Sequence, residues 1–417
     1  MARLLNASWS ERLRFASLAL WGAGALANEA IALFGLALCA AWFALEALPR
    51  SARALARAAR AWAPLWIFIA WCLAAPALDG RFPTATGAAR LLDWAALPIA
   101  GAAVAGLDQR RARALCAVLA SVFLLSCAVA AFQHYGLWPR PEAFARLAWT
   151  RIPFWRVYEP APAPGRFMAG GLLAHRLKFA HVGGLAVVYA ASLGAREEGR
   201  WRILGLSTSA LGAAAVIAFP YARAATAALL VALPVAVVLS LPWRRAALWI
   251  GAAVALALFL AAALDPALRS RFEGALSSGG SGDRDAILAS GVAAVRAHPW
   301  VGLGVGQFRP SRFAPPNTPQ YVLDNPGKAH NQVLSQAAET GVLGALLLLV
   351  LLAWLASSVR PDHPVGAAAL ASLALFAVLA LFHDPLIQAP FSLGLMLAVG
   401  AGLGVARRAQ GSESTRR

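Results

Sequence analysis

Charged residues are scarce in this chain of 417 residues. They make up 13% of it, while hydrophobic residues make up 60%. A soluble globular domain is about 25% charged and about 45–50% apolar. The composition therefore excludes an ordinary soluble domain and indicates an integral membrane protein.

Cysteine is also scarce. All four cysteines fall inside apolar stretches, where cysteine behaves as a small buried residue; they are Cys39, Cys72, Cys116 and Cys127. We therefore predict neither a disulfide framework nor a cysteine metal site. No apolar stretch stands alone at the N-terminus before a small-residue cleavage site, so the first is expected to stay as a membrane anchor.

The net charge of +18 is of the kind found in nucleic-acid-binding proteins. The arginines, however, are scattered in short clusters between apolar stretches, so we expect no nucleic-acid partner. Part of this charge is interpreted as a topology signal. The remainder lies in two long polar loops, where it suggests an anionic substrate.

Twelve stretches are apolar and long enough to be membrane spans, since a helix crosses the hydrocarbon core with about 20 residues. They lie near residues 14–28, 31–48, 61–78, 93–107, 114–137, 178–194, 203–219, 224–241, 246–264, 338–357, 365–382 and 388–406. The predicted fold is all-α, a polytopic membrane protein of about 12 transmembrane helices. The first two should form a hairpin with its turn near Asn28 and Glu29; one long span over 14–48 is the alternative.

The arginines of the short loops predict the orientation. One set of loops carries Arg50, Arg53, Arg57, Arg60, Arg110, Arg111, Arg113, Arg196, Arg200, Arg202, Arg244, Arg245, Arg360, Arg407 and Arg408. The alternating set carries only Arg81, Arg90 and Arg223. Basic short loops stay in the cytoplasm. Both termini are therefore expected inside, and the long loops 138–177 and 265–336 outside.

Three regions follow from this topology. They are N-terminal transmembrane helices at 1–137, a catalytic region with both outer loops at 138–345, and C-terminal transmembrane helices with a cytoplasmic tail at 346–417. The segment Ser51–Ala61 places its arginines on one helical face, so we expect it at the cytoplasmic lipid headgroups.

The first outer loop interleaves arginines with aromatic residues. Its members include Arg140, Arg146, Trp149, Arg151, Phe154, Trp155, Arg156, Tyr158, Arg166 and Arg176. One interpretation is interfacial anchoring, because Trp and Tyr settle at the headgroup level. The other is a binding surface for a phosphorylated, sugar-bearing lipid, because arginine grips phosphate in a fork.

The second outer loop contains a glycine- and serine-rich hinge, Ser277–Gly282, followed by a helix expected over 283–297 and capped by Ser281 or Asp283. Asp283 and Asp285 resemble the metal-binding acidic pair of soluble glycosyltransferases. The helix dipole explains them equally well, so no metal is predicted. Arg284, between them, is the stronger candidate for function.

Further along lie His298–Phe308, rich in glycine, and Gly327–Leu334, which contains Lys328, His330 and Asn331. A lone histidine at the start of a membrane helix is more often an interfacial residue than a catalyst. Glu339, nine residues on, would face the opposite side of a straight helix from His330. It is not a simple acid–base partner unless the helix is broken between them, and it needs a partner of its own.

A third motif, Phe219–Ala225, forms a very short outward turn around Arg223. The plain interpretation is an arginine that snorkels to the headgroups. The turn is otherwise apolar, however, and lies on the same face as both long loops.

Together these motifs resemble the O-antigen ligase family of bacterial inner-membrane glycosyltransferases. The likeness spans about residues 160–345. It rests on Gly165-Arg166-Phe167 with the downstream HRLKFAH, Tyr221-Ala222-Arg223, Arg284 with HPWVGLGVGQF, and HNQVLSQAAETGVLG from His330. One departure is the pair of alanines around Arg223, where the family often has Ser-Arg-Gly.

The resemblance implies a helical membrane bundle similar to GT-C glycosyltransferases, with a large helical periplasmic loop. It implies transfer of a polysaccharide from undecaprenyl pyrophosphate to a sugar of the lipid A core at the periplasmic face. The implied reaction is inverting and uses no metal or cofactor. Its catalytic residues would be His330, Arg284 and Arg223. His330 would either take the proton from the acceptor hydroxyl or hold the diphosphate. Substrate would be bound by Arg166, Lys328, Arg176, Asn331 and Glu339.

Two alternatives stay open. An O-antigen polymerase shares the donor chemistry and differs in its acceptor. A transporter or flippase of lipid-linked glycans often has twelve spans, but it usually carries charges at mid-membrane. In this sequence the mid-span positions are nearly uncharged, and His383 and Asp384 are placed at a span end. The polar groups gather at one surface, which favours an enzyme.

Overall fold

The computed structural model describes residues 8–48, 52–138, 159–161, 164–173, 175–241, 282–316, 318, 320–324 and 328–414. The predicted span 246–264, the hinge residues 277–281 and most of the first outer loop lie outside these residues.

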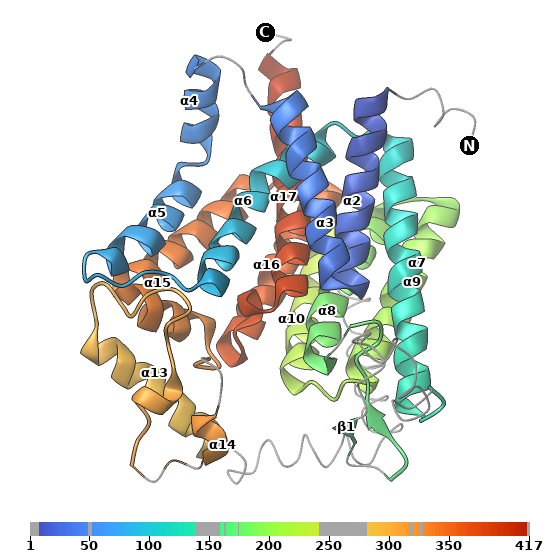
Figure 1. Cartoon of the computed structure of the whole chain (residues 1–417). Helices are drawn as coiled ribbons and strands as arrows, with labels where there is room; N and C mark the ends of the chain where they lie inside the picture. Colours follow the sequence, from blue (N-terminus) through green and yellow to red (C-terminus); the bar gives the residue numbers. More distant parts are fainter. Residues whose placement is uncertain are drawn as a thin grey trace.

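The described chain is a bundle of helices with one small two-stranded sheet (Figure 1). The helices are α2 (Trp9–Ala27), α3 (Glu29–Trp42) continued by the π-helical η1 (Phe43–Ala47), α4 (Ala52–Ala61), α5 (Ala63–Ala77), α6 (Ala85–Ala105), α7 (Gln109–His134), α8 (Arg176–Arg196), α9 (Gly199–Ala218), α10 (Arg223–Ser240), α13 (Gly282–Ala297), η6 (Pro310–Arg312), α14 (Gln320–Leu323), α15 (Gln332–Ser358), α16 (Pro364–Phe382), η7 (Pro385–Ile387) and α17 (Ala389–Ser414). The strands β1 (Glu159–Pro160) and β2 (Phe167–Met168) pair antiparallel.

The predicted all-α membrane fold is confirmed. Nine helices of the described chain are long and apolar enough to cross a membrane: α3 with η1, α6, α7, α8, α9, α10, α15, α16 and α17. Two other predicted spans coincide with α2 and the shorter apolar helix α5. The helix expected over 283–297 is α13, which begins one residue earlier, at Gly282.

The hairpin predicted at the start of the chain is present, and its turn is a single residue. Asn28 ends α2 and begins α3, and its side-chain oxygen accepts a hydrogen bond from the backbone N–H of Ala30 at 2.9 Å. Satisfying this otherwise unpaired N–H stabilises the start of α3. The backbone therefore turns at Asn28 and does not run as one helix over 14–48.

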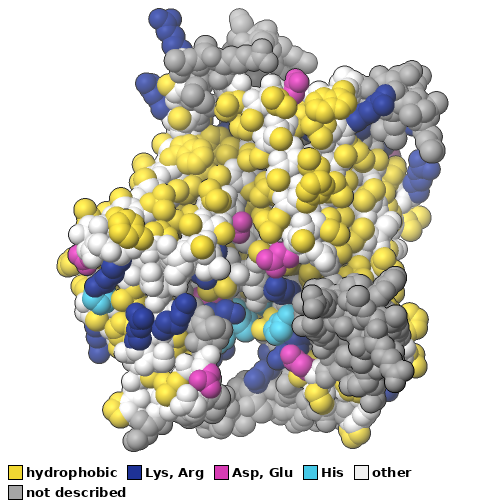
Figure 2. Space-filling view, in the orientation of Figure 1, with side chains coloured by type: hydrophobic (Ala, Val, Ile, Leu, Met, Phe, Trp, Pro, Cys, Tyr) yellow, Lys and Arg dark blue, Asp and Glu magenta, His cyan; other side chains and the backbone are white. Residues whose placement is uncertain are grey.

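The two ends of the bundle differ in what they carry. The first residues of α2, the projecting helix α4 and the last turns of α17 lie at one end, whereas α13, α14 and the β1–β2 hairpin lie at the other (Figure 1). A band of hydrophobic side chains separates these ends, and Lys, Arg and His side chains gather beyond it on the side of α13 (Figure 2). We call this second end the loop end.

A break in α15 fastens the second outer loop to the bundle. At Gly341 the backbone adopts φ 75° and ψ 172°, which interrupts the helical hydrogen bonding. Backbone hydrogen bonds across the break join Leu303 N–H to Ala338 O at 2.9 Å, Gly304 N–H to Glu339 O at 2.8 Å and Val342 N–H to Pro299 O at 2.8 Å. The loop that follows α13 is thereby held against α15 near the loop end.

Candidate active site

His330 stands two residues before α15 in a tightly held segment. The side-chain oxygen of Asn331 accepts from the backbone N–H of Leu334 at 3.0 Å, which caps α15. The backbone N–H of Ala329 donates to the Ser335 hydroxyl at 3.0 Å. His330 itself has φ 54°, a left-handed conformation that non-glycine residues adopt at a cost. Asn331, predicted to bind substrate, is placed as a helix cap that fixes His330.

Arg284 reaches the same segment from α13. Its guanidinium donates to the backbone carbonyl of His330 at 3.4 Å and to that of Phe382. It also lies over the Phe382 ring, 5.2 Å from the ring centroid. Burial lowers the pKa of Arg284, and the charge of Arg223 lowers it further. Arg284 stays a cation, because guanidinium is not deprotonated in proteins, and the coupling shows that Arg223 lies nearby.

Arg223 is the first residue of α10 and is exposed. The turn before it takes its shape from Tyr221, whose φ is 50° and whose buried ring packs on His134 with centroids 5.8 Å apart. Ala222 has an ordinary negative φ of −97°. The alanine beside Arg223 is therefore accommodated, since Tyr221 carries the left-handed conformation.

A row of imidazoles runs from His330 into the bundle. The His330 and His383 ring centroids lie 6.0 Å apart, and those of His383 and His181 lie 5.2 Å apart. The Nδ1 of His181 lies 3.0 Å from the Gln388 side-chain oxygen. Burial, together with the neighbouring cations Arg284 and Lys328, lowers the pKa of His330 to about 4. His330 is therefore neutral at neutral pH.

A buried carboxylate, Asp384, lies beside this row. Neither of its oxygens has a hydrogen-bond partner at ordinary distances. Burial raises its pKa, while the nearby Ser335 hydroxyl and the Lys328 ammonium favour the charged form. Burial also lowers the pKa of Lys328. The Lys328 side chain and the Asp384 carboxyl group thus both lie close to His330.

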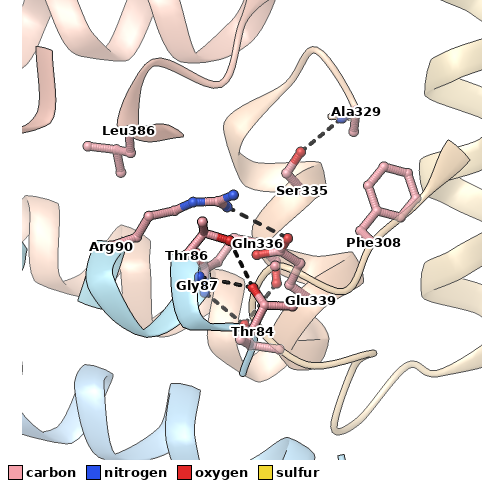
Figure 3. Close-up of polar contacts among 12 residues, drawn as sticks. Thr84, Thr86, Gly87, Arg90, Phe308, Ala329, Ser335, Gln336, Glu339 and Leu386 are labelled. Carbon is pink, nitrogen blue, oxygen red and sulfur yellow. Dashed lines mark hydrogen bonds and ion pairs between the residues drawn. The ribbon is translucent and has the colours of Figure 1, made fainter. Parts of the chain in front are cut away.

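Glu339 pairs with a residue of a different helix. Arg90 of α6 points towards it, with Nη1 3.9 Å from the carboxylate Oε1 (Figure 3). The start of α6 is in turn tied to the second outer loop, because the backbone N–H of Thr84 donates to the Val305 carbonyl at 3.0 Å. Glu339, predicted to bind substrate, is placed in an ion pair that joins α15 to α6. The helix break at Gly341 comes after it, so it is not turned towards His330.

The remaining predicted residues lie around the β1–β2 hairpin. The Arg166 guanidinium stacks over the Tyr135 ring, 4.6 Å from its centroid, and is exposed. Arg176 donates from Nε to Glu159 at 2.8 Å and from Nη1 to the Pro220 carbonyl at 3.2 Å. Arg176 is therefore placed as a tie between the hairpin and the turn before Arg223, whereas Arg166 presents its charge to solvent.

Sequence reasoning missed three residues of this group: His383, Asp384 and Arg90. The histidine and the aspartate were assigned only to the end of a span, and Arg90 only to a short loop. A buried ionisable residue at a membrane boundary is costly, so its presence in the sequence indicated that a partner must lie nearby. It did not show which other span would supply the partner.

The assembled group is suited to a phosphorylated ligand. Arg284, Arg223 and Lys328 supply cations around His330. In the described ranges no cluster of three or more His, Cys, Asp and Glu residues is placed to hold a metal ion. The geometry thus offers a neutral imidazole beside several fixed positive charges.

One family model matches part of the chain. Residues 208–349 match the family model described as O-Antigen ligase, a region that contains Arg223, Arg284, Lys328, His330 and Glu339. No curated protein matches the chain. The family supports an enzyme of the O-antigen ligase and polymerase type that acts on lipid-linked glycans in a membrane. Residues 208–349 of this multi-pass membrane protein are thus similar to the O-antigen ligases, the family that its motifs resemble.

Proposed function

We propose that this protein is an O-antigen ligase of the bacterial inner membrane. It transfers a polysaccharide from undecaprenyl pyrophosphate to a sugar of the lipid A core, forming lipopolysaccharide at the periplasmic face. The observation that carries the proposal is the contact of Arg284 with the backbone of His330. It places a permanent cation next to a neutral imidazole, as donor cleavage and acceptor activation each require.

In the proposed reaction, an acceptor hydroxyl attacks the anomeric carbon of the donor sugar. Its proton passes to the ring of His330. The bond from the anomeric carbon to the pyrophosphate oxygen breaks, and undecaprenyl pyrophosphate leaves with the electron pair. Arg284, Arg223 and Lys328 neutralise the charge that develops on the leaving group. Attack from the face opposite the leaving group inverts the anomeric centre.

Arg166 is proposed as a further phosphate ligand, because its guanidinium is exposed and held flat on Tyr135. Arg176, Asn331 and Glu339 support the site through Glu159, the start of α15 and Arg90, respectively. We assign them positioning roles within the proposed site. Their substitution should disturb the geometry around Arg223 and His330 before it disturbs substrate contact.

A deletion strain complemented with variants tests the proposal. The deletion should lose all polymer-capped lipopolysaccharide while polymer accumulates on the lipid carrier. His330→Ala should fail to restore capping, although it is made in normal amounts and inserted in the membrane. Caps of a single repeating unit would instead identify a polymerase, and an unchanged lipopolysaccharide profile would favour the transporter.

The proposed orientation has its own test. With native cysteines replaced, a cysteine at Arg312 should react with a membrane-impermeant thiol reagent added to cells with permeabilised outer membranes. A cysteine at Arg200 should react only after the inner membrane is opened. The reverse labelling pattern would place the site in the cytoplasm and contradict the assignment.

A further inference from the structure

A cavity of about 400 Å³ lies at the loop end, outside the group around His330. The α2–α3 turn, the residues before α8, α8 itself and the start of α17 form its walls. Its volume lies in the range of small-molecule sites, about 300–1,000 Å³. The proposed reaction, as described above, does not use this cavity.

The polar part of the cavity consists of Asn28 and one ion pair. Lys178 Nζ lies 3.0 Å from Glu29 Oε2, and the two side chains are 30% and 43% exposed. An ammonium offers donors and a carboxylate offers acceptors, so the pair matches the hydroxyl groups of a sugar. Its net charge is near zero, which suits a diphosphate less well than Arg284, Arg223 and Lys328 do.

Lysine itself is rare in this protein. Of its 37 basic residues other than histidine, Lys178 and Lys328 are the only lysines. Lys178 lies close enough to Lys328 to contribute, after burial, to lowering the pKa of Lys328. Both lysines therefore lie at the loop end, one in the cavity and one beside His330.

A stripe on α8 connects the cavity to the site. Lys178 and His181 are three residues apart in α8, so they occupy neighbouring positions on one side of the helix, and His175 caps its start. His181 meets His383 at 5.2 Å between ring centroids, and His383 meets His330 at 6.0 Å. A ligand held by Lys178 is thus near the row of imidazoles that ends at His330.

The other walls are apolar. Leu33, Leu172 and Pro390 line the cavity, and Leu33 is 45% exposed on α3, one of the helices able to cross the membrane. The cavity therefore combines a sugar-type polar pair with a boundary to the hydrocarbon layer. This lining matches a glycolipid, which has both a sugar and an apolar part, better than it matches a free sugar.

We propose that this cavity is the acceptor subsite, in which Lys178 and Glu29 hold core sugars of lipid A and direct an acceptor hydroxyl towards His330. The inference rests on the proposed function and extends it by assigning the two substrates to different places. The donor diphosphate occupies the arginine side, and the acceptor glycolipid occupies the α3–α8 side.

The test uses the full chain in lipid nanodiscs, purified lipid A-core and an undecaprenyl-pyrophosphate-linked glycan. Lys178→Met removes the ammonium, Glu29→Gln removes the carboxylate charge, and Ala30→Trp fills the cavity from its exposed rim. Arg312→Met is the matched loss of one exposed cation at the same end. Ala41→Trp is the matched bulky change at an exposed alanine near the other end of α3.

Loss of a charge-assisted hydrogen bond should weaken acceptor binding about tenfold or more. We expect Lys178→Met and Ala30→Trp to raise the acceptor KM and the Kd for lipid A-core by that factor, and Glu29→Gln to raise them less. The donor KM should stay within about twofold, and both control variants should match the natural protein.

Two results would overturn the acceptor assignment. One is a rise in the donor KM with an unchanged acceptor KM, and the other is a Kd for lipid A-core that stays the same in all three variants. Direct binding separates this inference from the proposed function. If lipid A-core binds in a Lys178-dependent manner but no glycan is transferred, the ligase function fails and the acceptor subsite stands.

Discussion

Arg284 donates a hydrogen bond to the backbone carbonyl of His330, so a single contact between α13 and the segment before α15 holds the cation beside the imidazole. The same guanidinium contacts the Phe382 ring at the end of α16. Three parts of the chain that are distant in sequence therefore meet at one side chain. This contact explains why an arginine, with its planar fork of donors, stands here.

Replacement of Arg284 should reduce transfer more than it reduces folding. Arg284→Lys keeps the charge but cannot bond to two carbonyls and stack on Phe382 at once, so we expect kcat to fall about 100-fold, as for other lost transition-state donors. The kcat of Arg284→Ala should be lower still. Arg296→Lys, an exposed change in the last turn of α13, is the control. Equal activity of Arg284→Lys and the natural protein would remove Arg284 from the reaction.

The pH dependence follows from the lowered pKa of His330. Because burial and two cations bring that pKa to about 4, the imidazole stays neutral well below its usual value of about 6.5. The acidic limb of kcat/KM, which reports the free enzyme, should therefore fall between pH about 5 and 4. Lys328→Met removes one of those cations and should move the limb towards higher pH.

The same group affects stability, in a direction that can be checked. Its folded pKa lies below its unfolded pKa, so the unfolded chain binds more protons between pH 4 and 6.5. The contribution of His330 is complete above pH 6.5 and is lost as the pH falls through 4. Thermal unfolding midpoints are measured across this pH range for the natural protein and for His330→Asn. The comparison separates unfolding by acid from the fall in kcat/KM at acidic pH. An acidic limb at pH 6.5 would contradict the assigned environment.

The break at Gly341 offers a test of how the outer loop is fastened. A Cβ at Gly341 would lie 2.0 Å from the Trp300 carbonyl oxygen, in addition to the cost of φ 75° for any other residue. Gly80 has a similar φ of 67°, but a Cβ there would meet no atom within 4 Å. Gly80→Ala should therefore show only the conformational cost of about 1–2 kcal/mol. Gly341→Ala should lower the unfolding midpoint much further and abolish transfer, and equal midpoints would show that the close contact is unimportant.

The sequence indicated the membrane helices well, because hydrocarbon thickness and unpaired backbone groups leave few alternatives. It also indicated the turn at Asn28, whose side chain is a strong helix cap. Arg284, Arg223 and His330 were identified by motif, and the structure brings them into one region. Local pattern was sufficient wherever the decisive interaction lay within one helix or at its end.

Pairings between distant helices could not be predicted in this way. Arg176 and Glu159 were recognised as charges of one loop, yet their ion pair depends on the fold of the β1–β2 hairpin. The stretch His298–Phe308 was recognised only as rich in glycine. In the structure, Gly302 and Gly304 have positive φ and approach the backbone of α15. The helical period predicts the face of the helix on which a residue lies. It does not predict which other helix packs against that face.

The ion pair of Arg90 and Glu339 provides the last prediction. The two side chains are 26% and 9% exposed, so removal of one leaves the other largely buried and uncompensated. Loss of one partner of a buried pair costs about 3–5 kcal/mol, whereas replacement of both by apolar groups is often near neutral; partial exposure of Arg90 reduces the first figure here. Arg90→Met should therefore lower the unfolding midpoint more than the double change Arg90→Met with Glu339→Leu.

Activity distinguishes support of the site from direct contact with substrate. If the pair only joins α6 to α15, the double variant should regain most of the stability and most of the kcat, because the His330 segment is again fixed. If the double variant is stable but its donor KM rises tenfold or more, Arg90 binds the donor diphosphate itself. Arg81, whose Nη1 donates to the Gly302 carbonyl at 2.9 Å from the same edge of the bundle, is the matched control. Arg81→Met should cost stability at the loop attachment without altering the donor KM.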